Sequence, residues 1–330
     1  YLQEPGRRLS LANQSFSRIG DGGNELLRLS HGRIDRIEIG PGVEVAPEVL
    51  RHALTTGTAL DFADGHGQTL GSLSPPTGTQ SALHLAQAEA ALDPDRRMAL
   101  ARRIVDARIA KQVARLRVLN RKRKDSEVIA AIANLVRSRR KTTKQFDDIA
   151  SLLGHEGAAT RIYWRALARL CDAHKGRFTR QRPAREPLNA AINYLTALLE
   201  RDVRAAVLRA GLHPGFGVLH TASDRGEACV WDLMEGFRAV LSEGLAVSLF
   251  NRGRLKSEMF DPTDGGIRIQ AEGRRALILG YEAALARPAK SGHTGKRHSQ
   301  RRRILEEARA LARYLRTPDS HPFRPDIQDF

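Results

Sequence analysis

The sequence predicts an α+β protein, in which a small N-terminal β domain precedes a larger, all-helical domain. Residues 1–75 contain short segments with partial alternation of apolar and polar residues, separated by glycine-rich breaks, as strands do. From residue 95 onwards, apolar residues recur at intervals of three and four, which is the spacing of amphipathic helices. A Pro- and Gly-containing stretch lies between the two patterns. We therefore expect a β domain over 1–75, a linker over 76–94 and a helical domain over 95–330.

The N-terminal region combines strand-like segments with one short helix. The strands are expected at residues 7–11, 26–29, 33–39 and 59–62. The helix is expected from Pro47 to Leu54, with Gly57 ending it. The dipeptide Asp64-Gly65 predicts a turn, so residues 60–63 and 69–73 are expected to form a hairpin.

Apolar stripes mark the helices of the second domain. The first helix should begin at Asp93-Pro94, a capping residue followed by proline. Its stripe consists of Met98, Ala101, Val105, Ile109, Val113 and Leu116. Further stripes are Val128, Ile132 and Leu135, then Phe146, Ile149 and Leu153 closed by Gly154, then Leu188, Ile192, Leu195 and Leu199 between Pro187 and Gly211.

The charge of the chain predicts a polyanionic partner. The 330 residues carry a formal net charge of +17, with a pI near 10.7. A membrane-surface protein would need a basic amphipathic helix with exposed large apolar groups, so nucleic acid is favoured. Aromatic residues make up only 5% of the chain, too few for a platform that stacks single-stranded bases. Binding to the backbone of duplex DNA fits better.

The chain also predicts a cytoplasmic protein. No apolar run reaches the length of a membrane span, and no signal peptide is recognisable. Cys171 and Cys229 lie far apart and match no zinc pattern, so we expect small buried hydrophobes in a reducing compartment. The chain opens with Tyr1-Leu2, which reads as part of a strand, so we expect one piece of a longer polypeptide.

Four basic stretches are candidates for DNA contact. They cover residues 115–124, 137–144, 177–185 and 290–303, and the last is expected to be flexible. Basic runs are usually solvated faces, but here no acidic region offsets the charge, so phosphate contact is favoured. Within the second stretch the expected DNA-binding residues are Arg137, Arg139, Arg140 and Lys141.

Residues 215–238 contain the strongest candidate for a catalytic site. A short apolar run leads to His220, and a helix then carries Asp232 and Glu235, which are three apart and leave the same side. An imidazole and two carboxylates, with Arg225 and Arg238 nearby, suit a hard divalent cation beside a phosphate. The alternative is an acid pair on a helix surface that simply faces water.

Glu156 is the best candidate for a third acid in the same site. The small residues Gly154, Gly157, Ala158 and Ala159 surround it, so another helix or a ligand can approach closely. The alternative is a glutamate that caps the first turn of a helix. A zinc-protease motif is excluded, because Ala159 occupies the position that would need a second histidine.

Four motifs in order carry a family resemblance. They are Leu-Gly-His-Glu-Gly-Ala-Ala-Thr-Arg-Ile-Tyr (153–163), Arg-Gln-Arg-Pro-Ala-Arg-Glu-Pro-Leu-Asn-Ala-Ala-Ile-Asn-Tyr (180–194), Ala-Gly-Leu-His-Pro-Gly-Phe-Gly-Val-Leu-His (210–220) and Asp-Leu-Met-Glu-Gly-Phe-Arg (232–238). The chain resembles the CRISPR-associated integrase of spacer acquisition, the Cas-one family. The first 75 residues resemble that family's N-terminal β domain. Some members are fused behind another enzyme, so this chain could be the C-terminal part of a fusion protein.

The resemblance implies a metal-dependent DNA endonuclease and integrase. The family's metal ligands fall on Glu156, His220 and Glu235, and Asp232 falls on a position that supports the site. Many members have aspartate where this chain has Glu235, which is one methylene longer and still an oxygen donor. Mixed oxygen and nitrogen ligation suits Mn²⁺ at least as well as Mg²⁺. The candidate phosphate clamps are Arg161, Arg182 and Arg238, each of which could instead be an ion-pair partner.

The resemblance also implies partners. The family works as a homodimer, and a small protein, Cas-two, bridges two dimers while they insert DNA into a CRISPR array. Two other functions use the same residues. One is a transposase-like integrase or nuclease of a mobile element outside CRISPR, and the other is a DNA-binding scaffold without catalysis.

Overall fold

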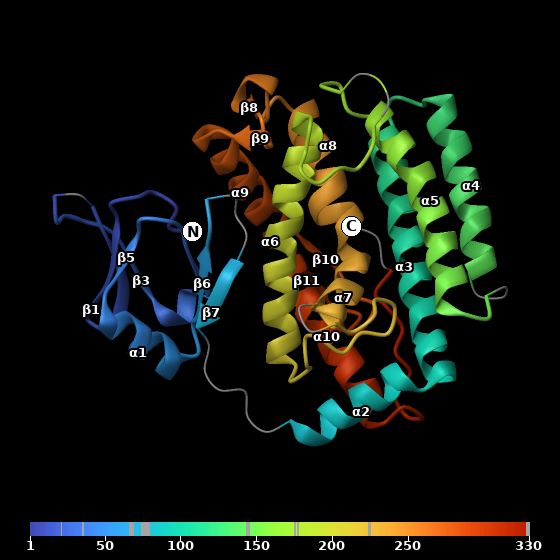
Figure 1. The fold of residues 1–330 in the computed structure, drawn as a ribbon, viewed down its shortest axis with the longest axis horizontal. Coiled ribbons are helices and arrows are strands. Elements are labelled where there is room, and N and C mark those ends of the chain that lie inside the picture. The colour runs from blue at the N-terminus through green and yellow to red at the C-terminus, as the bar shows by residue number, and fades with distance from the viewer. Residues whose placement is uncertain are drawn as a thin grey trace. The chain divides into compact units, whose positions relative to one another are not determined.

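The chain forms two compact units in the computed structural model, Tyr1–Gly78 and Thr79–Phe330. The structure describes residues 1–20, 22–34, 36–65, 69–73, 80–142, 146–174, 176, 178–223 and 226–327. The first unit is built mainly of strands and the second mainly of helices, which confirms the predicted α+β class (Figure 1). No helix in the described part of the chain is long and apolar enough to cross a membrane.

The first unit contains two small sheets. The larger has the strand order β3-β2-β1-β5, in which β5 joins β1 in parallel and the other neighbours are antiparallel. The smaller has the order β4-β6-β7, with β4 and β6 parallel. The strands are β1 (Arg8–Ala12), β2 (Ser15–Ile19), β3 (Glu25–Ser30), β4 (Arg36–Ile39), β5 (Glu44–Val45), β6 (Ala59–Ala63) and β7 (Thr69–Leu73).

Helix α1 (Pro47–Thr56) completes this unit, and most of its local predictions are confirmed. Gly57 ends the helix in the left-handed conformation, at φ 76°, as the sequence predicts. Strands β6 and β7 form the predicted hairpin, with Leu60 opposite Leu73. The expected strand over 33–39 is shorter, because residues 31–33 form a 3₁₀ turn before β4 begins. Strand β2 was not predicted separately.

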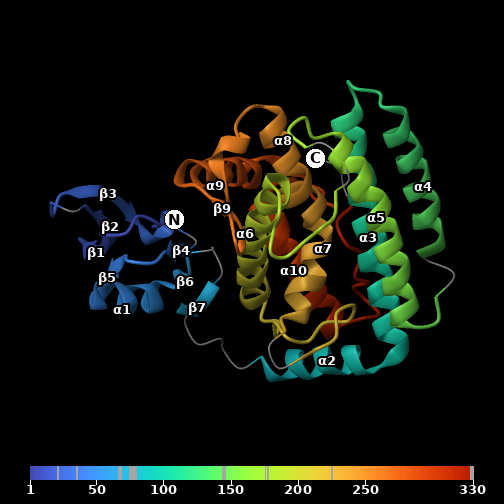
Figure 2. The same cartoon turned by 45° about the horizontal axis from the view of Figure 1, so that its top comes forward.

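The second unit is a bundle of helices around one large core. Figures 1 and 2 show α3, α4 and α5 as one side of the bundle, and α3 also packs against α7. The helices are α2 (Ser81–Leu92), α3 (Pro94–Asn120), α4 (Ser126–Thr142), α5 (Ile149–Arg169), α6 (Pro187–Arg209), α7 (Ala228–Arg238), α8 (Gly244–Asn251), α9 (Ala271–Ala286) and α10 (Gln300–Arg316). Two short hairpins accompany them, formed by β8 (Phe260–Thr263) with β9 (Gly266–Ile269) and β10 (Pro288–Lys290) with β11 (Arg297–Ser299).

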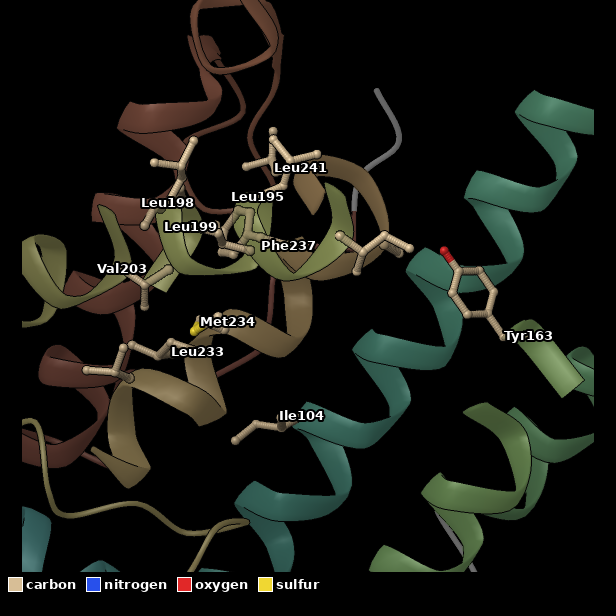
Figure 3. Close-up of a cluster of buried hydrophobic side chains, with 14 of the residues drawn as sticks. Ile104, Tyr163, Leu195, Leu198, Leu199, Val203, Leu233, Met234, Phe237 and Leu241 are labelled. Atoms are coloured by element: carbon tan, nitrogen blue, oxygen red, sulfur yellow. The ribbon is translucent and has the colours of Figure 1, made fainter. Parts of the chain in front are cut away.

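The predicted apolar stripes form the core of this unit. All six stripe residues of α3 are buried, and Asp93 caps the helix by accepting from the N–H groups of Asp95 and Arg96. On α7, Leu233, Met234 and Phe237 are buried in the same cluster as the apolar face of α6 (Figure 3). Beyond Arg238 the backbone continues as one π-helical turn, Ala239–Glu243, before α8 begins.

Three predictions about this unit are wrong. Residues 81–92, expected within the linker, form α2, which buries Leu83, Gln87 and Ala90 against the bundle. Gly154 does not end a helix, because α5 continues through Gly154 and Gly157 to Arg169. The helix continues through these glycines because its tertiary packing stabilises it by more than the modest loss of helix stability that glycine causes. The predicted boundary near residue 75 lies outside the described residues.

The third correction concerns residues 290–303, which are ordered rather than flexible. They form the turn and second strand of the β10–β11 hairpin and the first residues of α10. Arg303 is fully buried, and its Nε and Nη2 atoms lie 3.0 Å from Asp326 Oδ2. The backbone N–H of Asp326 donates to Glu307, which also pairs with His293. This basic stretch therefore helps to attach the C-terminal segment.

We expect Arg303→Met to lower the free energy of unfolding by about 3–5 kcal/mol, because it leaves the buried Asp326 carboxylate without its cation. Urea unfolding measures the change. The matched control is Arg302→Met on the same turn of α10, whose pair with Glu306 is 47% exposed on the arginine side. The control should cost less than about 1 kcal/mol. Equal losses in the two variants would contradict the structural role of Arg303.

Candidate active site

Two glutamates from separate helices meet around one arginine. Arg108 extends from α3, and its Nε lies 2.7 Å from Glu156 Oε1 of α5. Its Nη1 contacts Glu235 Oε2 of α7. The Glu235 side chain is only 4% exposed and the Glu156 side chain 18% exposed. Buried carboxylates are costly without a positive partner, and Arg108 supplies it here.

Polar neighbours fix the direction of Glu156. The Thr160 hydroxyl, one turn further along α5, donates to Glu156 Oε1 at 2.6 Å. Gln112 of α3 in turn donates to the Thr160 oxygen at 3.3 Å. Glu156 lies in the third turn of α5, whose N-cap is Asp148, so it is not a capping glutamate. The neighbouring His155 points elsewhere, since its Nε2 meets Ser138 and Thr142 of α4.

More charged groups surround the pair. Arg238 Nε lies 3.1 Å from Glu235 Oε1, so Glu235 faces an arginine on each side. Burial lowers the pKa of the Arg238 guanidinium, while the carboxylates of Glu243, Glu200 and Glu156 act to raise it. Glu243 ends the π-helical turn and is itself buried. The site therefore lies inside a region of closely spaced, opposite charges.

Asp232 organises the loop that carries His220. Its carboxylate accepts hydrogen bonds from the backbone N–H groups of Val218, Leu219 and His220, at 2.6, 3.0 and 2.9 Å. It also lies 2.7 Å from His220 Nδ1. With the proton on Nδ1 held by this contact, His220 Nε2 keeps its lone pair for another partner. The imidazole is partly exposed, and Trp231 packs edge-on against it.

The loop depends on close packing before α7. A Cβ atom on Gly217 would lie 2.6 Å from the carbonyl carbon of Ala228, so only glycine fits there. Gln87 of α2 donates to the carbonyl oxygens of His213 and Phe216, and Arg97 of α3 donates to that of Val218. Two helices far away in sequence thus hold the same loop.

This geometry separates Asp232 from Glu235. Their spacing alone suits one shared cation, whereas the family resemblance gives Asp232 only a supporting role. In the structure Asp232 uses its oxygens on the loop backbone, while Glu235 faces Arg108 and Arg238. Asp232 therefore supports His220, in agreement with the role that the family resemblance implies. Glu156 and Glu235 are the acids that the fold brings together.

The donor set is chemically suited to a divalent cation. The buried Glu235 carboxylate and the half-buried Glu156 carboxylate share a cationic group, and the guanidinium of Arg108 shows that positive charge fits between them. Hard cations such as Mg²⁺ and Mn²⁺ take carboxylate oxygens, and an imidazole nitrogen suits Mn²⁺. Among the residues that the structure describes, no three His, Cys, Asp or Glu side chains converge closely enough to hold a metal ion. Arg108 would therefore have to give up its place for the cation to bind.

The predicted DNA-binding arginines differ in their surroundings. Arg161 and Arg182 are exposed, whereas Arg238 is paired with Glu235. On α4, Arg137, Arg140 and Lys141 are exposed, but Arg139 makes a two-pronged contact with Asp106 at 2.8 and 3.0 Å. Arg139 is thus an ion-pair partner. Arg225 and part of the stretch 137–144 lie outside the described residues.

Three further residues belong to the site or its support, although the sequence patterns did not point to them: Arg108, Glu243 and Gln87. Arg108 stands three residues after Val105 and four before Gln112, so it occupies a core position within the stripe of α3. A charged residue at a core position is a signal of a buried ion pair, and that signal was available. Glu243 could not be found in this way, because the π-helical turn shifts the helical register before it.

The fold matches those of two solved structures. A structure of a casposase bound to an integration product has a TM-score of 0.81, with 22% identity over 96% of this chain and 90% of that one. A structure of a Cas6-RT-Cas1–Cas2 complex has a TM-score of 0.79, with 22% identity over 97% of this chain and 35% of that one.

The family follows from the sequence comparisons. The model of the family CRISPR associated protein Cas1 matches residues 1–283, and the chain belongs to this family. The CRISPR-associated endonuclease Cas1 3 of Thermus thermophilus is 28% identical over 98% of this chain and 94% of the relative. A Cas4 exonuclease/Cas1 endonuclease fusion of Rhodospirillum rubrum is 29% identical, and the chain spans 55% of its length.

We expect Asp232→Asn to lower the free energy of unfolding by about 1–3 kcal/mol, because an amide cannot accept all four contacts of the carboxylate. Strand transfer should fall about 10- to 100-fold, because His220 loses its fixed orientation. Glu227→Gln, just before α7, is the matched control, since its pair with Arg204 is partly exposed. A folded, fully stable Asp232→Asn protein without any activity would instead make Asp232 a direct ligand.

Proposed function

We propose that the chain is a metal-dependent DNA endonuclease and integrase that inserts new spacers into a CRISPR array. The observation that carries this proposal is the meeting of Glu156 and Glu235, from α5 and α7, around one positive charge. Family membership agrees with it, because the curated relatives are named endonucleases. A scaffold that only binds DNA would have no need to bring a buried and a half-buried carboxylate together.

Glu156, Glu235 and Nε2 of His220 would hold the Mg²⁺ or Mn²⁺ ion. When bound, this ion polarises the phosphoryl group and stabilises the departing 3′-oxygen. Thr160 keeps Glu156 Oε1 in one orientation, and Asp232 keeps the Nδ1–H tautomer of His220. These two contacts fix the ligand side chains before DNA binds. Less conformational entropy is therefore lost when the reacting groups come together.

The proposed reaction is a direct exchange of phosphodiester bonds. The 3′-hydroxyl of the incoming DNA end attacks a phosphorus atom of the repeat and loses its proton to solvent. A new P–O bond forms, and the bond to the 3′-oxygen of the repeat strand breaks. Arg182 and Arg161, which are exposed, and Arg238 beside Glu235 are candidates to bind the phosphate oxygens.

Double-stranded DNA is the proposed substrate, and a second copy of the chain and a Cas2 protein are the proposed partners. The net charge of +17 supports DNA as the substrate. The casposase structure with its integration product supports it as well, because that protein has the same fold. The Cas6-RT-Cas1–Cas2 complex supports a Cas2 partner. We place this work in the cytoplasm, where CRISPR arrays reside.

We expect Glu156→Gln, Glu235→Gln and His220→Ala each to abolish strand transfer, because each removes a proposed ligand. DNA binding should persist, because affinity comes mainly from contacts with the phosphate backbone. Strand-transfer assays with Mn²⁺ and duplex-binding titrations measure the two properties. The control is His155→Ala, since His155 lies beside Glu156 in sequence but contacts α4. A Glu156→Gln protein with full activity would contradict the assignment.

We expect the triple substitution of Arg137, Arg140 and Lys141 by alanine to weaken duplex binding equally for two unrelated sequences. The slope of log affinity against log salt should become shallower by about 2 to 3, one for each lost phosphate contact. Arg139→Ala is the control on the same helix and should leave the slope nearly unchanged, because Asp106 already engages that guanidinium. An unchanged slope in the triple variant, with loss of Cas2 assembly, would make this face a protein interface instead.

A further inference from the structure

Arg108 competes with any metal ion for the same oxygens. Its guanidinium lies against Glu156 Oε1 and contacts Glu235 Oε2, so it occupies the space between the two proposed ligands. A divalent cation must approach carboxylate oxygens to about 2.0–2.6 Å. Two cationic groups at that spacing repel strongly inside a buried site. The guanidinium and the metal ion therefore cannot both lie between the Glu156 and Glu235 carboxylates at the same time.

The chain needs Arg108 when no ion is bound. Glu235 is almost fully buried, and Arg238 reaches only its Oε1 atom, at 3.1 Å. Without Arg108, Glu156 and Glu235 would be two like charges facing one another with too little compensation. The arginine therefore stabilises the metal-free site.

A buried carboxylate and a buried hydroxyl lie near the Arg108 guanidinium. Burial and then the nearby Glu243 carboxylate raise the pKa of Tyr163, and Arg108 is close enough to act in the opposite direction. Glu243 and Tyr163 are both buried. The Tyr163 hydroxyl and the Glu243 carboxylate lie close enough to interact with each other, and within the described residues neither the hydroxyl nor Glu243 Oε2 accepts a hydrogen bond from a guanidinium. These two oxygen atoms can accept hydrogen bonds from the Arg108 guanidinium when Glu156 and Glu235 bind a metal ion.

We propose that Arg108 is a built-in counter-cation, which holds the Glu156–Glu235 pair in the metal-free protein and is displaced toward Glu243 when a divalent ion binds. This inference deepens the proposed function and rests on it. Arg108 is thus a positioning residue that keeps the two ligands apart and preorganised. Its removal should strengthen metal binding and weaken the metal-free fold.

The test compares Arg108→Met, Arg108→Lys and the control Arg103→Met in the chain of 330 residues. Arg103 lies on the same helix and donates to the carbonyl oxygen of Phe323, away from the acids. Calorimetry with Mn²⁺ and no DNA measures affinity, and thermal unfolding in EDTA measures the metal-free stability. We expect Arg108→Met to bind Mn²⁺ about 10-fold more tightly and to melt earlier in EDTA. Arg108→Lys should stay near the wild type in both measurements, and Arg103→Met should keep the wild-type Mn²⁺ affinity.

Two results would overturn this inference in different ways. If Glu156→Gln abolishes Mn²⁺ binding but Arg108→Met leaves the affinity unchanged or weaker, the metal site stands and the competition does not. If the wild type binds no Mn²⁺ and Arg108→Met binds none either, the proposed metal-dependent function fails together with the inference. If Arg108→Met is unfolded in EDTA, its refolding on addition of Mn²⁺ supports the inference, and a chain that stays unfolded at saturating Mn²⁺ contradicts it.

Discussion

The helical unit depends most on one electrostatic constraint, which is that a buried and a half-buried carboxylate must share a positive charge. Glu156 and Glu235 come from α5 and α7, and Arg108 comes from α3, which packs against both helices. These three helices cannot shift against each other without leaving a buried carboxylate uncompensated. The predicted apolar stripe of α3 and the buried apolar residues Leu233 and Phe237 of α7 supply the packing that keeps them in place. Hydrophobic packing and charge placement thus specify the same arrangement.

Two acidic residues within one turn of helix α7, Asp232 and Glu235, contact different parts of the site. Asp232 faces the preceding loop and binds its backbone, while Glu235 faces α3 and α5. The loop is also held from outside by Gln87 and Arg97. His220 therefore lies on a segment that hydrogen bonds from several elements hold in place, although no helix or strand contains it. The close approach at Gly217 makes this segment intolerant of larger residues.

Much of the fold could be predicted from local patterns, and less of the site. Strands, capped helices and the helix end at Gly57 depend on neighbouring residues, so the sequence predicts them well. Helix α2 was missed because its alanine-rich sequence has little amphipathic contrast. The contacts of Asp232 with residues 218–220 depend on how the loop folds back onto α7, which periodicity does not encode. Arg108 was overlooked because a charged residue in a helix was assumed to face solvent.

The central claim is that Glu156, Glu235 and His220 together form a centre for a divalent ion. Anomalous diffraction from crystals soaked in Mn²⁺ tests this claim most directly. We expect one anomalous peak within bonding distance of both carboxylates and of His220 Nε2, with the Arg108 guanidinium moved away from Glu235. The claim would be contradicted by crystals that bind Mn²⁺ elsewhere while Arg108 still bridges the two glutamates.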